Sequence, residues 1–384
     1  MTGASRMPLR CWAEIDLAAL ERNLTAIKNA LPDGISYIAV VKADAYGHGI
    51  QQTVARLMHA GIDLFAVANV AEAATIREIG SGWPILILSP TLDEEDDYLF
   101  EYDLIPTISS LEEMNRLEKK AKDRNKSLNI HLKIDTGMGR VGIWHEYAAE
   151  LLQSTQESPN LNLHGIYTHF ASAEGDLPFT QLQRQRFMDV IRSVPSISTN
   201  DLLIHADNSA GVNTLNSESV YNAVRVGLMQ FGSTPYPDSL FGRVPVEPIF
   251  AFKAKIGLVK SLPKGVDISY GRTCTLNRDT KVAVICAGYG DGVPRMLSNR
   301  GHALIHGQFC PILGRVTMDQ TIVDVTDLDQ VPQSGDEACF IGSQDKSQVS
   351  LEQFSDWAET IPWEILCSVT KRVPRLYHTA VATR

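Results

Sequence analysis

Residues 38–49 read IAVVKADAYGHG, and this stretch decides how the first half of the chain folds. The apolar run from Ile38 to Val41 is typical of a buried strand, and a helical pattern begins at Ile50. Lys42 ends the strand, and a turn with glycines, a tyrosine and a histidine separates it from the helix. The stretch therefore predicts a strand, a turn and a helix, with a lysine at the carboxyl end of the strand.

Two interpretations of Lys42 fit this stretch equally well. A lysine ammonium is costly to bury and its pKa falls readily on desolvation, so Lys42 is a candidate for Schiff-base chemistry. It is also a candidate for a plain structural role, in which it reaches solvent or pairs with Asp44. Other parts of the chain must decide between the two.

The composition is that of an ordinary globular protein. The chain has 384 residues, of which 44% are hydrophobic and 21% charged, which is enough for two domains. Its net charge of −10 argues against a nucleic-acid partner or an acidic membrane surface. No apolar run approaches the roughly 20 residues that span a bilayer, and residues 1–12 lack the apolar core of a signal peptide. We expect a cytoplasmic enzyme or binding protein.

The cysteines indicate neither a metal site nor a disulfide framework. There are six, five of them in the last third of the chain, and none forms a C-x-x-C pair. We interpret them as reduced residues that mostly serve packing.

Strand-like and helix-like segments alternate over the first two thirds of the chain. Asp16 is a good N-cap for an amphipathic helix that starts at Leu17. The predicted strands lie near residues 36–42, 63–67, 84–88, 104–108, 128–134, 163–168, 202–206 and 223–231. The predicted helices include residues 51–60, 71–79, 94–102, 111–122 and 181–191. Eight strands in such alternation predict an α/β fold, a (β/α)8 TIM-like barrel over residues 13–245.

A second domain is predicted after Pro245, where strand-like runs with few helices replace the alternating pattern. Strand-like runs at 249–259, 281–287, 303–306, 321–325 and 337–341 are separated by Gly, Pro, Asp and Asn, with few helices. We expect a mainly β C-terminal domain over residues 246–384, with residues 1–12 joining it.

Polar clusters follow several of the predicted barrel strands, at the ends where barrels carry their active sites. They are Lys42, residues 135–140 (DTGMGR), residues 168–170 (THF), residues 205–210 (HADNSA) and residues 225–228 (RVGL). Taken singly, His169 is compatible with a core histidine, Arg140 and Arg225 with salt bridges, and Ser209 with a helix cap. Their shared placement favours a common site.

The last two strands of a barrel frequently hold a phosphate, and here they carry Ser209 and the Gly227-Leu228 backbone. A phosphate at that edge and a lysine across the mouth of the barrel suggest pyridoxal phosphate, with Lys42 as its Schiff-base lysine.

The whole chain resembles the alanine racemase family. Residues 41–49 (VKADAYGHG) are similar to the family's cofactor-lysine signature. Further blocks follow in the family's order, at residues 135–140, 269–271, 288–292, 314–320 and 372–375, and the likeness covers about residues 12–377. The resemblance implies a pyridoxal-phosphate enzyme of fold type III, a head-to-tail homodimer with shared active sites, and a role in supplying D-alanine for peptidoglycan.

The resemblance also implies roles for single residues. Racemisation needs an acid/base group on each face of the substrate Cα, and the family supplies Lys42 and Tyr270, the latter from the partner subunit. His169, Arg225 and Arg140 would support them. The other implied contacts are Tyr46, Ser209, Gly227 and Leu228 to the phosphate, Arg140, Met318, Asp319 and Tyr289 to the substrate, and Lys133 as a carbamylated lysine.

Two positions depart from the family pattern. Thr317 replaces a frequent cysteine and Lys371 a frequent tyrosine, which puts strict alanine specificity in doubt and leaves a broader-specificity or serine racemase as an alternative.

Three functions of other classes compete with a racemase: a fold-III amino-acid decarboxylase, a non-catalytic cofactor-binding protein and a cofactor-free class I aldolase. Tyr270 with His169 and Arg225 favours the racemase over the decarboxylase.

Overall fold

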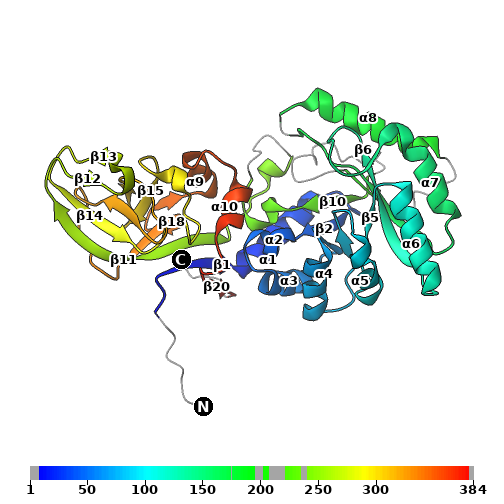
Figure 1. Ribbon diagram of the computed structural model, residues 1–384, viewed down its shortest axis with the longest axis horizontal. Helices are drawn as coiled ribbons and strands as arrows, with labels where there is room; N and C mark the ends of the chain where they lie inside the picture. The colour runs from blue at the N-terminus through cyan, green and yellow to red at the C-terminus, as the bar shows by residue number, and fades with distance from the viewer. Residues whose placement is uncertain (1–7, 174, 195–201, 207–220, 235–239, 380–384) are drawn as a thin grey trace, which may run out of the picture. The chain divides into compact units, whose positions relative to one another are not determined.

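The computed structural model describes residues 8–173, 175–194, 202–206, 221–234 and 240–379, and the chain divides into two compact units (Figure 1). We call Glu21–Ala45 with Gly49–Val246 the barrel unit. We call Met1–Leu20, Tyr46–His48 and Glu247–Arg384 the β unit.

Eight parallel strands form the centre of the barrel unit, close to where the sequence predicts them. They are β2 (Ser36–Val40), β3 (Leu64–Val67), β4 (Ile85–Ile87), β5 (Thr107–Ile108), β6 (Leu128–Asp135), β8 (Leu161–Tyr167), β9 (Leu203–His205) and β10 (Ala223–Val226). Their order is β10-β2-β3-β4 in one sheet and β5-β6-β8-β9 in the other, where the two-residue strand β7 (Ile143–Trp144) also pairs with β6.

Backbone hydrogen bonds connect the two sheets at both seams. Between β4 and β5, Ile105 donates to the Ile85 oxygen and accepts from the Ile87 nitrogen, both at 2.9 Å. Between β9 and β10, the Asn222 nitrogen donates to the Ile204 oxygen at 3.0 Å. The arrangement is that of the predicted (β/α)8 barrel.

The barrel helices lie along the outside of these strands (Figure 1). They are α3 (Ile50–His59), α4 (Val70–Ile79), α5 (Asp96–Glu101), α6 (Leu111–Asp123), α7 (Ala148–Glu157) and α8 (Leu177–Ser193). Side-chain oxygens cap several N-termini, as Asn69 does for α4 and Ser110 for α6. The prediction that Asp16 caps α1 (Leu17–Ala30) is confirmed, since Asp16 accepts a hydrogen bond from the Ala19 nitrogen at 2.8 Å.

The last barrel strand is shorter than predicted. It ends at Val226, and a 3₁₀ turn, η5, occupies Leu228–Phe231. An apolar run alone does not distinguish a strand from a buried turn, so the prediction for residues 227–231 was wrong. Gly227 and Leu228 consequently lie just beyond the strand rather than on it.

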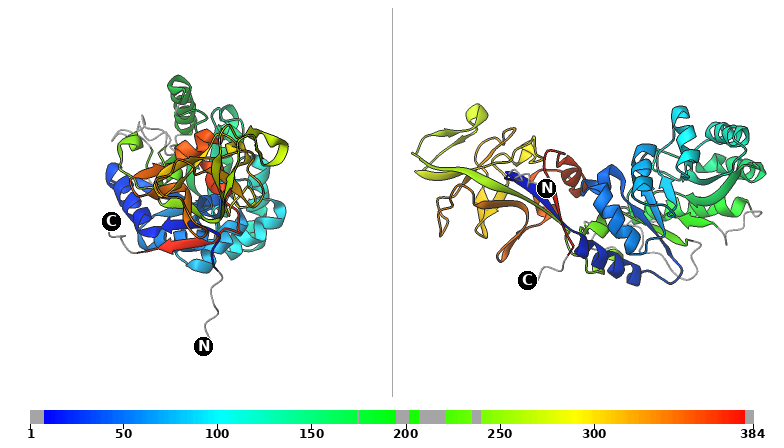
Figure 2. Two further views of the ribbon diagram at one scale, coloured as in Figure 1. Left: turned by 90° about the vertical axis from the view of Figure 1, so that its left-hand side faces the viewer. Right: turned by 90° about the horizontal axis from the view of Figure 1, so that it is seen from below.

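The β unit is built on a nine-stranded sheet whose main path is β16-β15-β18-β11-β1-β20. Its strands are β1 (Cys11–Asp16), β11 (Phe250–Leu262), β14 (Thr280–Ile285), β15 (His302–Ile305), β16 (Gln308–Pro311), β17 (Thr321–Asp324), β18 (Glu337–Gln344), β19 (Ser347–Val349) and β20 (Arg375–His378). Strand β1 has no clear pattern of its own in the sequence; it pairs antiparallel with the long strand β11 and parallel with β20 (Figure 2). Two short helices, α9 (Leu351–Trp357) and α10 (Pro362–Ser368), complete the unit.

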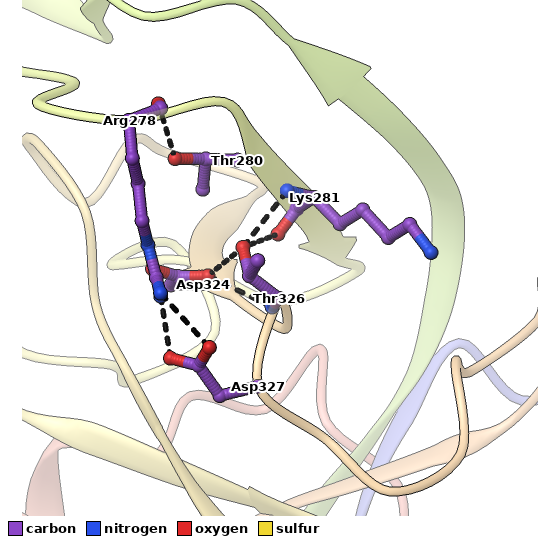
Figure 3. A network of polar contacts seen from close by, with 6 residues as sticks. All are labelled: Arg278, Thr280, Lys281, Asp324, Thr326 and Asp327. Atoms are coloured by element: carbon purple, nitrogen blue, oxygen red, sulfur yellow. Dashed lines mark hydrogen bonds and ion pairs between the residues drawn. The ribbon is translucent and has the colours of Figure 1, made fainter.

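A polar network ties β14 to the segment that follows β17 (Figure 3). Arg278 pairs with Asp327 and, at 3.3 Å, with Asp324. The Thr326 hydroxyl donates to Asp324 at 2.6 Å and accepts from the Lys281 nitrogen at 2.9 Å. Because Arg278 and Asp327 are exposed, we expect the network to fix the geometry of this edge more than to add stability.

Candidate functional site

Lys42 follows β2 and begins a turn of unusual handedness. Ala43, Asp44, Ala45 and Tyr46 all have φ between 54° and 56°, which is a left-handed helical turn. This conformation costs a non-glycine residue about 1–2 kcal/mol, so the surroundings must hold it. The turn sits at the carboxyl end of β2 and places the half-buried Lys42 at the rim of the barrel unit.

Two carboxylates hold the left-handed turn within the barrel unit. Glu72 of α4 accepts hydrogen bonds from the Ala43 nitrogen at 2.6 Å and from the Ala68 nitrogen, after β3, at 2.8 Å. Asp44 accepts from the Ile50 nitrogen, the first of α3, at 2.7 Å. Glu72 was not among the residues selected from the sequence, because nothing local connects it to residue 43.

The residues that follow the turn belong to the β unit. Tyr46 is buried, and the Gly47 and His48 oxygens accept hydrogen bonds from Arg375 Nε at 3.1 Å and Tyr377 Oη at 3.0 Å. Gly47 has φ 76°, and a Cβ there would lie 2.3 Å from the Leu366 oxygen. Only glycine fits this position.

Arg225 of β10 is a buried cation with neutral acceptors around it. Its Nη1 donates to His205 Nδ1 at 2.7 Å, and its Nη2 donates to the Thr168 oxygen at 2.9 Å and to His169 Nδ1 at 3.2 Å. The Ala206 oxygen accepts a further bond at 3.0 Å. These bonds fix the plane of the guanidinium at the carboxyl ends of β8, β9 and β10.

His169 is a neutral hydrogen-bond donor at this rim. A guanidinium can only donate, so His169 Nδ1 must accept and the ring proton of the neutral form must be on Nε2. Desolvation lowers the pKa of His169 well below its ordinary value, and the charges of Arg225, Lys133, Arg140 and Lys42 lower it further. Burial and these four basic side chains therefore favour the neutral form of His169.

Lys133 of β6 is one of these basic side chains and is buried, as Arg225 is. Its Nζ lies 4.5 Å from the centroid of the Tyr167 ring, and the loop closes over it so tightly that a Cβ at Gly142 would be 2.7 Å from its Cγ. Desolvation, followed by the charges of Arg225 and Arg140, lowers the pKa of Lys133 well below its ordinary value. Its buried position therefore favours the uncharged amine over the ammonium.

Arg140 is exposed on a loop that the carboxylate of Asp135 organises. Asp135 accepts from the backbone nitrogens of Gly137 at 2.9 Å, Met138 at 2.8 Å and Arg140 at 3.2 Å. This explains why an aspartate directly precedes the Thr-Gly-Met-Gly-Arg run. Among the remaining barrel candidates, Gly227 and Leu228 lie between β10 and η5, and Ser209 lies outside the described residues.

The β unit carries the other candidates on three neighbouring loops. Tyr270 is at the tip of the hairpin formed by β12 (Asp267–Ile268) and β13 (Cys274–Thr275), with 72% of its surface exposed. The Ser269 hydroxyl donates to the Arg315 oxygen at 2.6 Å, which attaches the hairpin to the loop containing Met318. The Tyr289 nitrogen donates to the Thr317 oxygen of the same loop at 2.9 Å.

Asp319 is held by an arginine to which the sequence analysis gave no role. Arg372 donates to Asp319 at 2.7 Å and to the buried Asp291 at 2.6 Å. Both aspartates and Arg372 occur in blocks that resemble the family, and that was the available signal. Lys371, next to Arg372, is exposed.

The fold and this cluster define a class of protein: an α/β barrel that presents a lysine, a neutral histidine and several cations at the carboxyl ends of its strands, joined to a β unit. Barrel enzymes bind anionic ligands at that end. In the part of the chain that the structure describes, no group of three or more His, Cys, Asp or Glu side chains is placed to hold a metal, and no helix is long and apolar enough to cross a membrane.

Comparison with known proteins gives the family. The family model for the alanine racemase N-terminal domain matches residues 15–235, and that for the alanine racemase C-terminal domain matches residues 249–377. An alanine racemase of Halothermothrix orenii is 38% identical over 96% of this chain and 97% of its own length. The chain belongs to the alanine racemase family.

Solved structures agree with this assignment. The alanine racemase of Clostridium difficile 630 has a TM-score of 0.89 and 31% identity, with 97% of each chain covered. The alanine racemase from Bartonella henselae, described with covalently bound pyridoxal phosphate, has a TM-score of 0.87 and 28% identity, covering 97% of this chain and all of its own. Both the fold class and the family predicted from the sequence are confirmed.

Proposed function

We propose that this protein interconverts L-alanine and D-alanine with pyridoxal phosphate as cofactor. Family membership supports the reaction, and the structure of the Bartonella relative supports the cofactor. The observation that carries the proposal is the barrel rim, where Arg225 donates a hydrogen bond to His169 at 3.2 Å and the basic side chains Lys42, Lys133 and Arg140 help to lower the pKa of that histidine.

The residues of the rim fit an anionic, aldehyde-bearing cofactor. Lys42 would supply the amine that binds the aldehyde, while Tyr46, Ser209 and the Gly227 and Leu228 backbone are the proposed phosphate contacts. Pyridoxal phosphate, when bound, supplies an aldehyde that condenses with an amine and a conjugated ring that accepts the electron pair released at Cα. Arg225, a permanent cation, would face the ring nitrogen and keep it unprotonated.

Two acid/base groups then serve the two faces of the substrate. Lys42 Nζ removes or returns the Cα proton on one face, and Tyr270 Oη does so on the other. A phenol's ordinary pKa is near 10, so the phenolate needs a donor nearby. His169 is suited to this task because its Nε2 carries the proton, and Arg225 keeps it there.

A further group of residues would bind the substrate carboxylate and line the entrance. Arg140 and the Met318 backbone nitrogen are the proposed carboxylate contacts, with Asp319 and Tyr289 beside the entrance. Arg372 would hold Asp319 in place. Because Thr317 and Lys371 depart from the family pattern, a comparison of alanine with serine as substrates tests how strict the specificity is.

Carbamylation of Lys133 is a second part of the proposal. An uncharged amine adds CO2 and releases one proton, which converts the lysine to an anionic carbamate. The lowered pKa of Lys133 favours the reactive amine, and the charges of Arg225 and Arg140 favour the anionic product. Growth of a signal in the 13C spectrum on exposure to 13CO2, absent in Lys133→Ala, would support the modification, and identical spectra would exclude it.

A homodimer with shared active sites would explain why the β unit exposes large side chains on its candidate loops. Tyr270, Tyr289 and Met318 are 72%, 43% and 51% exposed, and such clusters mark interaction surfaces. We propose that a second copy of the chain covers them and receives Tyr270 in its own site. A cytoplasmic location and a role in supplying D-alanine for bacterial peptidoglycan stay predictions.

The decarboxylase alternative is not favoured, because decarboxylation needs no acid/base group on a second face. The decisive experiment is incubation of the protein with L-alanine and pyridoxal phosphate, followed by chiral analysis. We expect a mixture of both enantiomers, and none of the D form with Lys42→Ala. Carbon dioxide release without D-alanine would favour the decarboxylase, and an unchanged substrate would refute both.

A further inference from the structure

Three histidines form a hydrogen-bonded line inside the barrel unit that no step of the proposed reaction uses. His205 Nδ1 lies 2.7 Å from Arg225 Nη1, His205 Nε2 lies 3.1 Å from His131 Nδ1, and His131 Nε2 lies 2.9 Å from His164 Nδ1. We call His205, His131 and His164 the histidine line. His131 and His205 are fully buried, and His164 is half-buried.

Arg225 determines which ring nitrogen donates and which accepts in each hydrogen bond of the histidine line. Since a guanidinium only donates, His205 Nδ1 accepts, and the single proton of a neutral ring must be on Nε2. His205 Nε2 then donates to His131 Nδ1, and His131 Nε2 donates to His164 Nδ1. Burial lowers the pKa of each of these histidines below its ordinary value, consistent with three neutral rings of the same tautomer.

The backbone of β8 has two features that make room for the line. Its pairing with β6 changes register, so that Ile130 faces Leu163 whereas His131 faces Gly165, and His164 is the extra residue of a β-bulge. Gly165 has no side chain, and a Cβ there would lie 2.6 Å from Cε1 of His131 and 2.8 Å from the Leu203 oxygen. The bulge and the glycine thus bring the His131 and His164 rings together.

We propose that the histidine line is a positioning device for Arg225, and through it for His169. In each ring the unprotonated Nδ1, at the negative end of the ring dipole, is directed toward the guanidinium. The three dipoles therefore stabilise the buried charge of Arg225 together and fix the rotation of its guanidinium. Arg225 Nη2 then stays directed at His169 Nδ1, at 3.2 Å, which keeps the His169 proton on Nε2. His131 and His164 are accordingly positioning residues, far along the line from the reacting atoms.

The direct test is 15N NMR of the full-length protein labelled in its histidine ring nitrogens. Single variants at His131, His164 and His205 assign the signals. We expect all three rings to show a protonated Nε2 and an unprotonated Nδ1 at neutral pH. A proton on Nδ1 of any of the three would overturn the proposal. This readout needs neither substrate nor turnover.

A kinetic test separates positioning from mere packing. His131→Leu can neither accept nor donate, whereas the amide of His131→Gln can do both. We expect kcat for alanine to fall by about 10- to 100-fold in His131→Leu, with KM little changed and a substantial recovery in His131→Gln, as for other residues that orient a functional group. His302→Leu, in β15, is a matched control. Equal kcat values in both His131 variants would contradict the proposal.

The inference rests on the proposed role of Arg225, but the two fail separately. If the wild-type protein did not racemise alanine and the tautomers were as expected, the proposed function would fail and the line would stand. If racemisation occurred with a different tautomer pattern, only the line would fail. Should His131→Leu not fold, the NMR result and the glutamine variant still decide.

Discussion

Burial, more than the nearby charge of Arg225, favours the neutral forms of His169, His131 and His205. Desolvation lowers the pKa of each well below the ordinary value, and Arg225 contributes to each shift. The site requires neutral imidazole rings, because a protonated His169 could no longer accept a hydrogen bond from Arg225. The same shifts make the fold sensitive to acid.

We predict that stability declines as the pH falls below 6.5, the ordinary pKa of these histidines. The unfolded chain binds protons there whereas the folded chain does not, at about 1.4 kcal/mol per pH unit for each histidine. Urea unfolding between about pH 5 and 7.5 measures this slope. His205→Asn should have a shallower slope than the wild type, with His59→Asn on the exposed end of α3 as control. An unchanged slope in His205→Asn would refute the prediction.

Elements that depend on local pattern were predictable, whereas backbone of rare conformation was not. Short apolar runs between turn residues predicted the eight barrel strands, and a helical pattern predicted the start of α3 at Ile50. The left-handed turn at residues 43–46 was not predictable, because Ala and Tyr rarely adopt positive φ and Asp does so mostly as a single residue. One of the two carboxylates that stabilise it, Glu72, is distant in sequence.

Glu72 tests how the turn is held. Replacing it by alanine leaves the backbone N–H groups of Ala43 and Ala68 without the carboxylate they bond to. We predict a loss of about 1–3 kcal/mol in the free energy of unfolding, measured with urea. Hydrogen exchange at residues 43–49 should accelerate as well.

Glu78→Ala, an exposed change on the same helix, is the matched control and should leave both quantities within error. If Glu72→Ala were no less stable than Glu78→Ala, other contacts would have to hold the turn.

At the scale of the whole molecule, the sequence predicted a barrel followed by a β-rich region and the family to which the chain belongs. Candidate residues could be predicted because they occur in short sequence blocks that follow one another in the family's order. It did not predict β1, Glu72 or the histidine line. Those depend on pairing between segments far apart in the chain, which no local pattern reveals.

The shared-site dimer makes a quantitative prediction for mixed subunits. Lys42→Ala and Tyr270→Phe should each be nearly inactive alone. A dimer that contains one of each has one site with both residues intact, if Tyr270 comes from the partner. Random mixing should therefore restore about a quarter of the wild-type activity. Refolding a mixture of the two variants and measuring racemisation checks this.

A single-chain site gives a different result, because every site in the mixture would then lack one of the two residues. Activity no higher than the sum of the separate variants would therefore refute the shared site. Wild-type chains treated in the same way provide the reference.

In the proposed mechanism, an amine and a phenol act on opposite faces of the substrate Cα. The most direct test is Tyr270→Phe, incubated in D2O with each alanine enantiomer. With only Lys42 left, we predict that one enantiomer exchanges its Cα hydrogen for deuterium, whereas inversion falls by about 10²–10⁴-fold. Inversion at the wild-type rate in Tyr270→Phe would contradict the claim.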